Sequence, residues 1–383
     1  MTHESDGVVF IYMLVMISLV VLWEHRMRLI PSSVFAVALG MAVSSVLGAV
    51  APDHAPFEFA PEVFLYILLP PILLNSSLKF KVESLKHNWV ASLLHASVGT
   101  LLAMLWIFWG IMVWTRGTSV QMSIPQALLF ASILAPTDTV ATMAMTRTIG
   151  VADTYLLEVL ENESVMNDAL AVVLVRLFKT LHTREMDRWI PLEVVGMGIF
   201  STSAAMAFGY AAARLVRRFK IQDMTSYYLS SFLVYGLCEC VGVSGILGLF
   251  VYGSSIHPPD TFKESVQSIS TIIEAYVYLM LGLALHTYDM ASFGISFLIL
   301  LSCICGRVLV VFMLGMCLRR RHPQHWHMRS MMFFSLCGVR GAISYALCMA
   351  LNEPFMKSTT FVVILSTIFA FGTFQKCMFR MLL

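Results

Sequence analysis

The stretch LENESVMNDALAVVL, residues 160–174, lies in apolar sequence yet carries three acidic residues and two amides. Residues four apart share a face of an α-helix, so Glu163 and Asn167 form one polar stripe. Ser164 and Asp168 form a second stripe, about 100° around the helix. A carboxylate with an amide can hold a buried arginine, whereas hydroxyl and carboxylate oxygens are hard ligands for Na⁺, Li⁺ or a proton. The stretch therefore predicts a helix that carries ionic groups into apolar surroundings.

The composition of the whole chain is that of a polytopic membrane protein. Of its 383 residues 58% are hydrophobic and 13% are charged, and the mean hydropathy is +0.79; both are far from the values of soluble domains. The formal net charge of +2 is too small to favour a nucleic-acid partner. The eight cysteines are scattered, which predicts packing residues and no disulfide framework.

A membrane span needs about 20 apolar residues, and the chain offers thirteen such segments without a soluble domain. The chain ends just after the last span, so we expect no regulatory tail. The N-terminus is predicted outside and the C-terminus inside, because this orientation places most of the 25 Lys and Arg residues in cytoplasmic loops. The predicted spans are 8–24, 30–50, 61–78, 89–114, 125–146, 154–178, 190–213, 225–241, 243–257, 266–287, 293–318, 328–351 and 358–379.

Two of these spans, the fifth and the twelfth, contain a helix breaker next to a charged residue. Pro136 precedes Asp138 in the fifth, and Gly338 and Gly341 flank Arg340 in the twelfth. Proline and glycine free backbone groups that the membrane interior tolerates only in buried or water-lined regions. Two interrupted spans that run in opposite directions are typical of transporters built from inverted repeats. Arg176 and Glu239 lie near span ends and are interpreted as snorkelling residues.

Several motifs together resemble the monovalent cation/proton antiporters, specifically the sodium/proton exchanger branch. The resemblance covers nearly the whole chain, in the order found in that family. The four motifs that carry it are LLPPILLNSSL (68–78), ILAPTDTVA (133–141), ENESVMNDALAVVL (161–174) and CGVRGAISYAL (337–347), with support from GVSGILGLFVYG (242–253), EAYVYLMLGL (274–283) and CGRVLVV (305–311).

The resemblance implies a role for each polar residue within the spans. Asp168 beside Asn167 is implied to bind the cation or the proton, with the Thr137 carbonyl, the Ser164 hydroxyl and Asp138 nearby. Asp138 is implied to pair with Arg340, and Glu163 to pair with Arg307 through a bridge by Asn167. Glu274 matches an acidic position of the family, and Asn75 stands where an acidic residue is common.

The resemblance also implies an architecture and partners. Core helices within 89–178 and 293–351 are expected to move against scaffold helices within 8–78 and 190–257, in a homodimer surrounded by lipid. No cofactor is expected beyond the transported Na⁺ and H⁺. The plasma membrane is the expected location, with an endomembrane as the alternative, and the regulation of pH is the expected role.

The chemistry of Asp168 also follows from the residues themselves. Burial of a carboxylate disfavours its charged form, so either H⁺ or a cation can neutralise it, and competition for one site couples the two ions. Because the neighbouring residue is the neutral Asn167, one charge is neutralised in each half-cycle. The sequence therefore predicts electroneutral one-for-one exchange of Na⁺, or of Li⁺ or K⁺, for H⁺ by alternating access.

Three other functions compete with this interpretation. A cation channel could use the same buried carboxylates, and a transport-inactive homologue is suggested by Asn75. An intramembrane serine protease is suggested only by the short pattern Gly242-Val243-Ser244-Gly245. The chain has no H-E-x-x-H zinc motif and no phosphate-binding loop, so a transporter is favoured over an enzyme.

Overall fold

The computed structural model describes residues 12–23, 31–50, 61–80, 82–118, 120–138, 153–183, 190–220, 223–286, 293–351 and 353–382. Within these ranges all regular structure is helical, which confirms the predicted all-α class. Each predicted span overlaps a described helix, although the second half of the fifth, from residue 139, lies outside the described residues. The number of spans and the orientation of the termini stay predictions.

The helices of the first half of the chain begin with an apolar helix over Tyr12–Trp23. They continue as α2 (Ser32–Val50), α3 (Pro61–Val63), the π-helix η1 (Phe64–Leu68), α4 (Leu69–Lys79), α5 (Val82–Leu93), the π-helix η2 (Leu94–Gly99), α6 (Thr100–Trp114), α7 (Ile124–Leu134) and α9 (Thr154–Thr183).

The second half of the chain continues with α10 (Ile190–Arg218), α11 (Met224–Cys240), α12 (Gly245–Ser255), α13 (Asp260–Leu283), the 3₁₀ turn η3 (Ala284–His286) and α14 (Phe293–Arg319). It ends with α15 (Met328–Leu336), α16 (Ala342–Met349) and α17 (Pro354–Leu382). By length and composition, four described helical segments can cross a membrane: Asn88–Trp114, Gly198–Arg218, Asp260–Leu283 and Phe293–Arg319.

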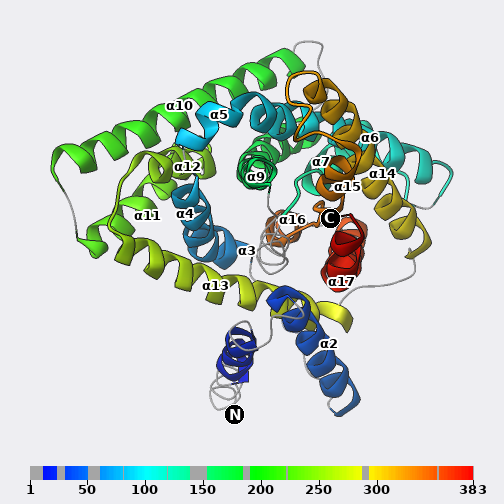
Figure 1. The fold of residues 1–383 in the computed structure, drawn as a ribbon. Helices are drawn as coiled ribbons and strands as arrows, with labels where there is room; N and C mark the ends of the chain where they lie inside the picture. Colours follow the sequence, from blue (N-terminus) through cyan, green and yellow to red (C-terminus); the bar gives the residue numbers. More distant parts are fainter. Residues whose placement is uncertain are drawn as a thin grey trace.

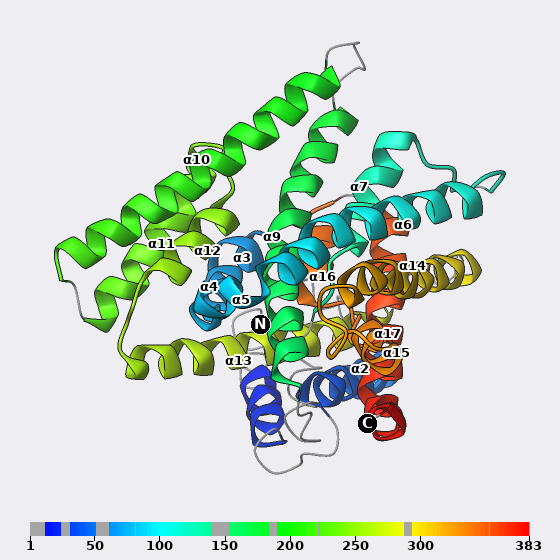
Figure 2. The same ribbon diagram turned by 45° about the horizontal axis from the view of Figure 1, so that its top comes forward.

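α9 lies in the middle of the molecule. It is seen nearly end-on in Figure 1, with α10, α11 and α12 on one side and α6, α7, α14 and α15 on the other. Figure 2 shows α9 standing upright between the two groups. It packs against α5, η2, α7 and α10, so the helix that carries Asp168 contacts both groups.

The two helices that carry breakers are interrupted in the structure. α7 starts with a capping box, in which the Ser123 hydroxyl accepts a hydrogen bond from the Gln126 backbone N–H, and it ends at Leu134. Pro136 follows this end and cannot continue the helix, because it lacks an N–H donor. On the other interrupted helix, residues 337–341 separate α15 from α16.

The two interruptions meet each other. The Asp138 backbone N–H donates to the Val339 carbonyl over 2.7 Å, so two unwound segments of distant origin share a backbone hydrogen bond. The approach requires glycine at position 341, because a Cβ there would overlap the Asp138 side chain. This crossing places residues 135–138 and 337–341 side by side at the centre of the fold.

The tight connection between α11 and α12 explains the segment that resembled a protease motif. Gly242 adopts φ +81°, a conformation that L side chains rarely adopt. The Ser244 hydroxyl accepts a hydrogen bond from the Leu247 backbone N–H over 3.4 Å and caps α12. Ser244 is fully buried, so its role in the structure is that of a helix cap, and the protease interpretation loses its nucleophile.

α13 is held against α2 by a pair of glycines. A Cβ on Gly282 would overlap the Val37 carbonyl oxygen and would lie 2.9 Å from the Gly40 Cα, so the two backbones pack without intervening side chains. Such contacts between small residues are a common way for membrane helices to associate. They fix the end of α13, the helix that also carries Glu274.

We expect Gly282→Ala to destabilise the fold by about 1–3 kcal/mol, since overpacking forces backbones apart. The matched control is Gly236→Ala in α11, where nothing lies within 4 Å of an added Cβ; it should be neutral or slightly stabilising, because Ala favours a helix over Gly. Thermal unfolding of the purified proteins in detergent measures both. A Gly282→Ala protein that melts at or above the wild-type temperature would contradict the packing.

Candidate functional site

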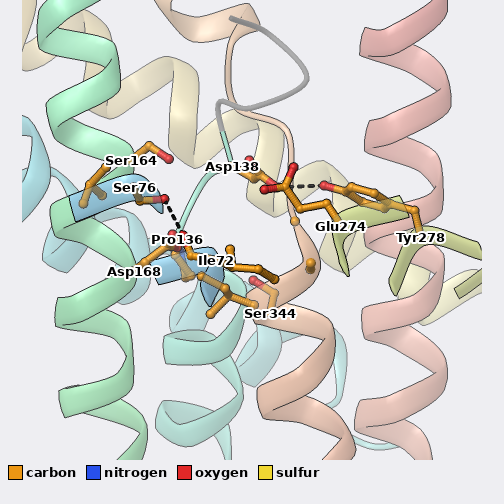
Figure 3. Close-up of a pocket in the computed structure, with 13 residues that line it drawn as sticks. Ile72, Ser76, Pro136, Asp138, Ser164, Asp168, Glu274, Tyr278 and Ser344 are labelled. Carbon is orange, nitrogen blue, oxygen red and sulfur yellow. Dashed lines mark hydrogen bonds between the residues drawn. The ribbon is translucent and has the colours of Figure 1, made fainter. Parts of the chain in front are cut away.

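A cavity of about 40 Å³ lies where the crossing segments face α9, α4 and α13 (Figure 3). Three carboxylates line it: Asp138 from the first break, Asp168 from α9 and Glu274 from α13. Ser76, Ser164, Tyr278 and Ser344 supply hydroxyl groups to its wall. The volume accommodates a small ion with water.

The first break and α9 are joined by two hydrogen bonds beside this cavity. The Ser164 hydroxyl donates to the Thr137 carbonyl over 3.2 Å, and the Asn167 amide donates to the Thr137 hydroxyl over 3.1 Å. Thr137, Ser164 and Asn167 are all buried. The Thr137 carbonyl is available here because the helix has ended, so an unwound backbone and a polar helix face bring their oxygens together.

Asp168 lies one helical turn beyond Ser164, on the same face of α9. Among the described residues no hydrogen bond to its carboxylate is seen, and the Asp138 carboxylate is the charged group that acts on it. The other two acids have hydrogen-bond donors. Tyr278 donates its hydroxyl to Asp138 over 2.8 Å, and Ser270 donates to Glu274 over 2.8 Å. Asp168 is therefore the acid whose oxygens are open to an incoming ion.

Tyr278 is a site residue that the sequence did not single out. It stands four residues after Glu274 on α13, so both side chains lie on one face, and that spacing could have identified it. Ser76 and Ser344 were also missed. Serines are common packing residues in membrane helices, so the sequence holds no signal that distinguishes these two serines from the other serines of the chain.

Arg340 has partners other than the expected carboxylate. Its guanidinium donates to the carbonyls of Ala135 and of Pro136, the latter over 2.7 Å. The expected ion pair between Asp138 and Arg340 is not among the described contacts. Instead, Arg340 binds carbonyls of the first break, and the Asp138 backbone N–H binds the Val339 carbonyl of the second. The physical reason is that the end of α7 leaves carbonyls without helical donors, and a buried guanidinium satisfies two of them.

The structure brings Glu163 and Arg307 together. The guanidinium of Arg307 contacts both carboxylate oxygens, one of them over 3.0 Å, and also donates to the Phe334 carbonyl over 3.3 Å. The Glu163 side chain is 2% exposed and that of Arg307 is 8% exposed. Asn167 does not bridge the pair as expected, because its amide donates to Thr137. The pair fastens α9 to α14 and α15.

Asn75 and a further ion pair lie outside the lining of the cavity. Asn75 is buried on α4 but does not line the cavity, where its neighbour Ser76 takes the place. Arg176 and Glu239, expected to snorkel separately, form an ion pair between α9 and α11. Arg176 also donates to the Val243 carbonyl over 3.1 Å, and Glu239 accepts from the Gly245 backbone N–H over 2.9 Å.

The electrostatics of the cavity are one-sided. No lysine, arginine or histidine of the described chain lines it, although three carboxylates do. The nearby guanidiniums are directed elsewhere, Arg307 to Glu163 and Arg340 to backbone carbonyls. Carboxylates that share a low-dielectric site repel one another unless a proton or a cation neutralises them. The arrangement therefore suits a monovalent cation or a proton as its occupant.

Comparison with known proteins gives one family across the chain. The sequence profile described as "Sodium/hydrogen exchanger, transmembrane" matches residues 12–381. Sodium/hydrogen exchanger 8 of Mus musculus is 26% identical over 97% of this chain and 71% of its own length. Sodium/hydrogen exchanger 9 of Equus caballus is 28% identical over 82% of this chain and 54% of its own length.

A solved structure shares the fold. The sodium proton antiporter MjNhaP1 from Methanocaldococcus jannaschii at pH 8 superimposes with a TM-score of 0.77. The superposition covers 100% of this chain and 99% of the other, at 19% sequence identity. At that identity the likeness is one of fold, and it extends over the whole arrangement of helices described above.

We expect Glu163→Gln to destabilise the protein by about 3–5 kcal/mol, because it leaves the Arg307 charge buried without its carboxylate. Replacing both partners, as Glu163→Gln with Arg307→Met, should recover most of that loss, since no lone charge remains. The matched control is Glu239→Gln, whose partner Arg176 is 38% exposed; its cost should be about 1 kcal/mol or less.

Unfolding of the four proteins in detergent, followed by tryptophan fluorescence, measures these differences. A double variant as unstable as Glu163→Gln alone would contradict the argument. So would a Glu239→Gln variant that loses as much stability as Glu163→Gln.

Proposed function

Since the chain belongs to the sodium/hydrogen exchanger family, we propose that it exchanges Na⁺ for H⁺ at Asp168, one for one and without net charge movement. Its relatives are transporters and not enzymes, and its apolar helices make it an integral multi-pass membrane protein. The observation that carries the proposal is the cavity with three carboxylates and no basic side chain among the described residues.

The proposed cation ligands are the Asp168 carboxylate, the Ser164 hydroxyl and the Thr137 carbonyl, with Asn167 and Asp138 beside them. Support comes from the hydrogen bond between Ser164 and Thr137, which holds two of these oxygens next to each other. All are hard oxygen donors, as Na⁺ or Li⁺ prefers. Glu274 lines the same cavity and takes an accessory role, whereas Asn75 lies outside the lining.

Competition at Asp168 couples the two ions in this proposal. When Na⁺ binds, it displaces the proton from the carboxylate; when Na⁺ leaves, a proton from water takes its place. A bare carboxylate is costly to move through the membrane interior, so the protein returns only when one of the two ions is bound. The result is coupled exchange of Na⁺ for H⁺ and not an uncoupled leak of either ion.

The proposed stoichiometry rests on which carboxylates have donors. Asp138 accepts from Tyr278, and Glu274 accepts from Ser270, so both have partners that do not depend on the transported ion. Asp168 is then the group whose charge is neutralised in each half-cycle, because its neighbour Asn167 is neutral. One Na⁺ for one H⁺ moves no net charge across the membrane, and Li⁺ can replace Na⁺ at such ligands.

Movement by alternating access is the proposed route from one face to the other. The core helices within 89–178 and 293–351 are proposed to move against scaffold helices within 8–78 and 190–257, in a homodimer. Support comes from the two groups of helices on either side of α9 in Figure 1, and from the buried Glu163–Arg307 pair that binds α9 to α14. The plasma membrane stays the predicted location.

We expect Asp168→Asn to abolish Na⁺-driven proton efflux from reconstituted vesicles, because an amide cannot alternate between H⁺ and Na⁺. The matched control is Glu161→Gln, which also replaces a carboxylate by an amide on α9 but at a residue that does not line the cavity. The flux of this control should stay within about twofold of the wild type. The wild-type rate should not respond to a clamped membrane potential. Persistent exchange in Asp168→Asn would refute the proposed site, and a Na⁺ current without proton movement would establish a channel instead.

We expect Ser164→Ala to raise the Na⁺ concentration for half-maximal exchange about tenfold, since it removes one ligand worth about 1–1.5 kcal/mol. The maximal rate should change less, because Asp168 is intact. Ser132→Ala is the control: that serine is buried in α7 and bonds only the Leu129 carbonyl within the described chain. An unchanged half-saturation in Ser164→Ala would remove Ser164 from the cation site.

A further inference from the structure

Tyr278 places its hydroxyl group against the Asp138 carboxylate at the wall of the central cavity (Figure 3). The hydroxyl donates to Asp138 Oδ2 over 2.8 Å, and the tyrosine is 5% exposed. A buried tyrosine hydroxyl usually finds a hydrogen-bond partner, but here the partner is a carboxylate of the proposed ion site. Hydrogen bonds to ionised acceptors are about twice as strong as those between neutral groups, so the contact restricts the movement of this carboxylate.

The crossing of the two breaks holds Asp138 from the other side. Its backbone N–H donates to the Val339 carbonyl over 2.7 Å. Its side chain packs so closely on the second break that a Cβ at Gly341 would overlap both Cγ and Oδ2. Oδ2 is the oxygen that accepts from Tyr278. The Asp138 carboxylate is therefore held between the backbone of one break and the hydroxyl of a distant helix.

The helix that carries Tyr278 is itself fixed in place. Gly282 follows Tyr278 by one turn of α13 and packs against Gly40 of α2 without intervening side chains. α13 also packs against α4, which contributes Ile72 and Ser76 to the same cavity. A tyrosine ring has two side-chain torsions and little freedom once it is buried. The hydroxyl is thus a rigid support for Asp138.

We propose that Tyr278 is a positioning residue that determines which cation this exchanger accepts, because it fixes the Asp138 carboxylate beside the ion bound at Asp168. Selectivity among hard cations depends on the size of the cavity and on the number and flexibility of its oxygen ligands. A carboxylate held on two sides cannot move outward to make room for a larger ion. The cavity of about 40 Å³ therefore accepts Na⁺ or Li⁺ more readily than K⁺.

Removal of the hydroxyl has a specific consequence in this proposal. Without its donor the Asp138 side chain can turn about its own torsions, and the lining of the cavity adapts to a larger ion. K⁺ then binds better relative to Na⁺. If the hydroxyl only stabilised the packing of α13, its loss would weaken the binding of all cations alike. The inference rests on the proposed exchange function at Asp168.

The test is the cation concentration for half-maximal proton flux in reconstituted vesicles, measured with Na⁺, Li⁺ and K⁺ in turn. The wild type should need more K⁺ than Na⁺. We expect Tyr278→Phe to lower the ratio of the K⁺ value to the Na⁺ value by about fivefold, part of the effect of about tenfold that a hydrogen bond to a charged group has on an equilibrium constant. The matched control is Tyr276→Phe, at a half-buried residue of α13 outside the cavity lining; its ratio should equal that of the wild type.

Three outcomes would overturn the inference: an unchanged ratio in Tyr278→Phe, an equal rise of the half-maximal concentration for all three cations, or a wild type that does not distinguish K⁺ from Na⁺. Tyr278→Gln keeps a donor but on a flexible side chain, so it should also lower the ratio. It decides the question if size-exclusion profiles show that Tyr278→Phe is misfolded. A wild-type protein without proton flux driven by any of the cations would instead refute the proposed exchange function itself.

Discussion

The central constraint in this protein is that backbone polar groups within a membrane must find partners inside the protein. Two unwound segments meet that requirement by crossing. The Asp138 backbone N–H binds the Val339 carbonyl, and Arg340 binds the carbonyls of Ala135 and Pro136. Each break thus satisfies groups of the other, and the Thr137 carbonyl remains to face α9. Without the crossing, neither interruption would be tolerated at this depth, and the cavity would have no wall on that side.

The distribution of charge around the crossing follows from the same need of buried polar groups for partners inside the protein. The buried Arg307 and Arg340 satisfy a carboxylate and backbone carbonyls, and no arginine among the described residues lines the cavity. Tyr278 and Ser270 give Asp138 and Glu274 neutral donors, which do not cancel their charge. Within the described lining no basic side chain faces these carboxylates, so the cavity suits a proton or a cation. A basic residue in that lining would remove the reason for an ion to bind.

Sequence reasoning reached the parts of this structure that depend on local spacing. Pro136 and the glycines at 338 and 341 located both breaks, and the four-residue spacing on α9 placed Glu163 and Asp168 on neighbouring faces. The partner of Arg340 could not be predicted, because a guanidinium can donate to a carboxylate or to a freed carbonyl, and only the crossing decides which of them lies within reach. Arg176 and Glu239 are 63 residues apart, and no periodicity relates such positions.

The π-helix η2 shows a further limit of spacing arguments. A π turn contains more residues than an α turn, so it changes the direction of every later side chain on the helix. The apolar sequence LHASVG of residues 94–99 does not reveal this change.

The polar contacts that hold α9 to its neighbouring helices differ in burial. The difference indicates at which helix boundary movement requires the least free energy. Toward α14 and α5 the helix is held by the Glu163–Arg307 pair and by the contact between Asn162 and Ser92, all buried. Toward α11 it is held by Arg176 and Glu239, with side-chain exposures of 38% and 17%. A buried charge that loses its partner is costly, whereas a partly exposed one can be solvated. For the proposed alternating access, α9 would thus stay with α5 and α14, and the boundary with α11 would be the one that opens.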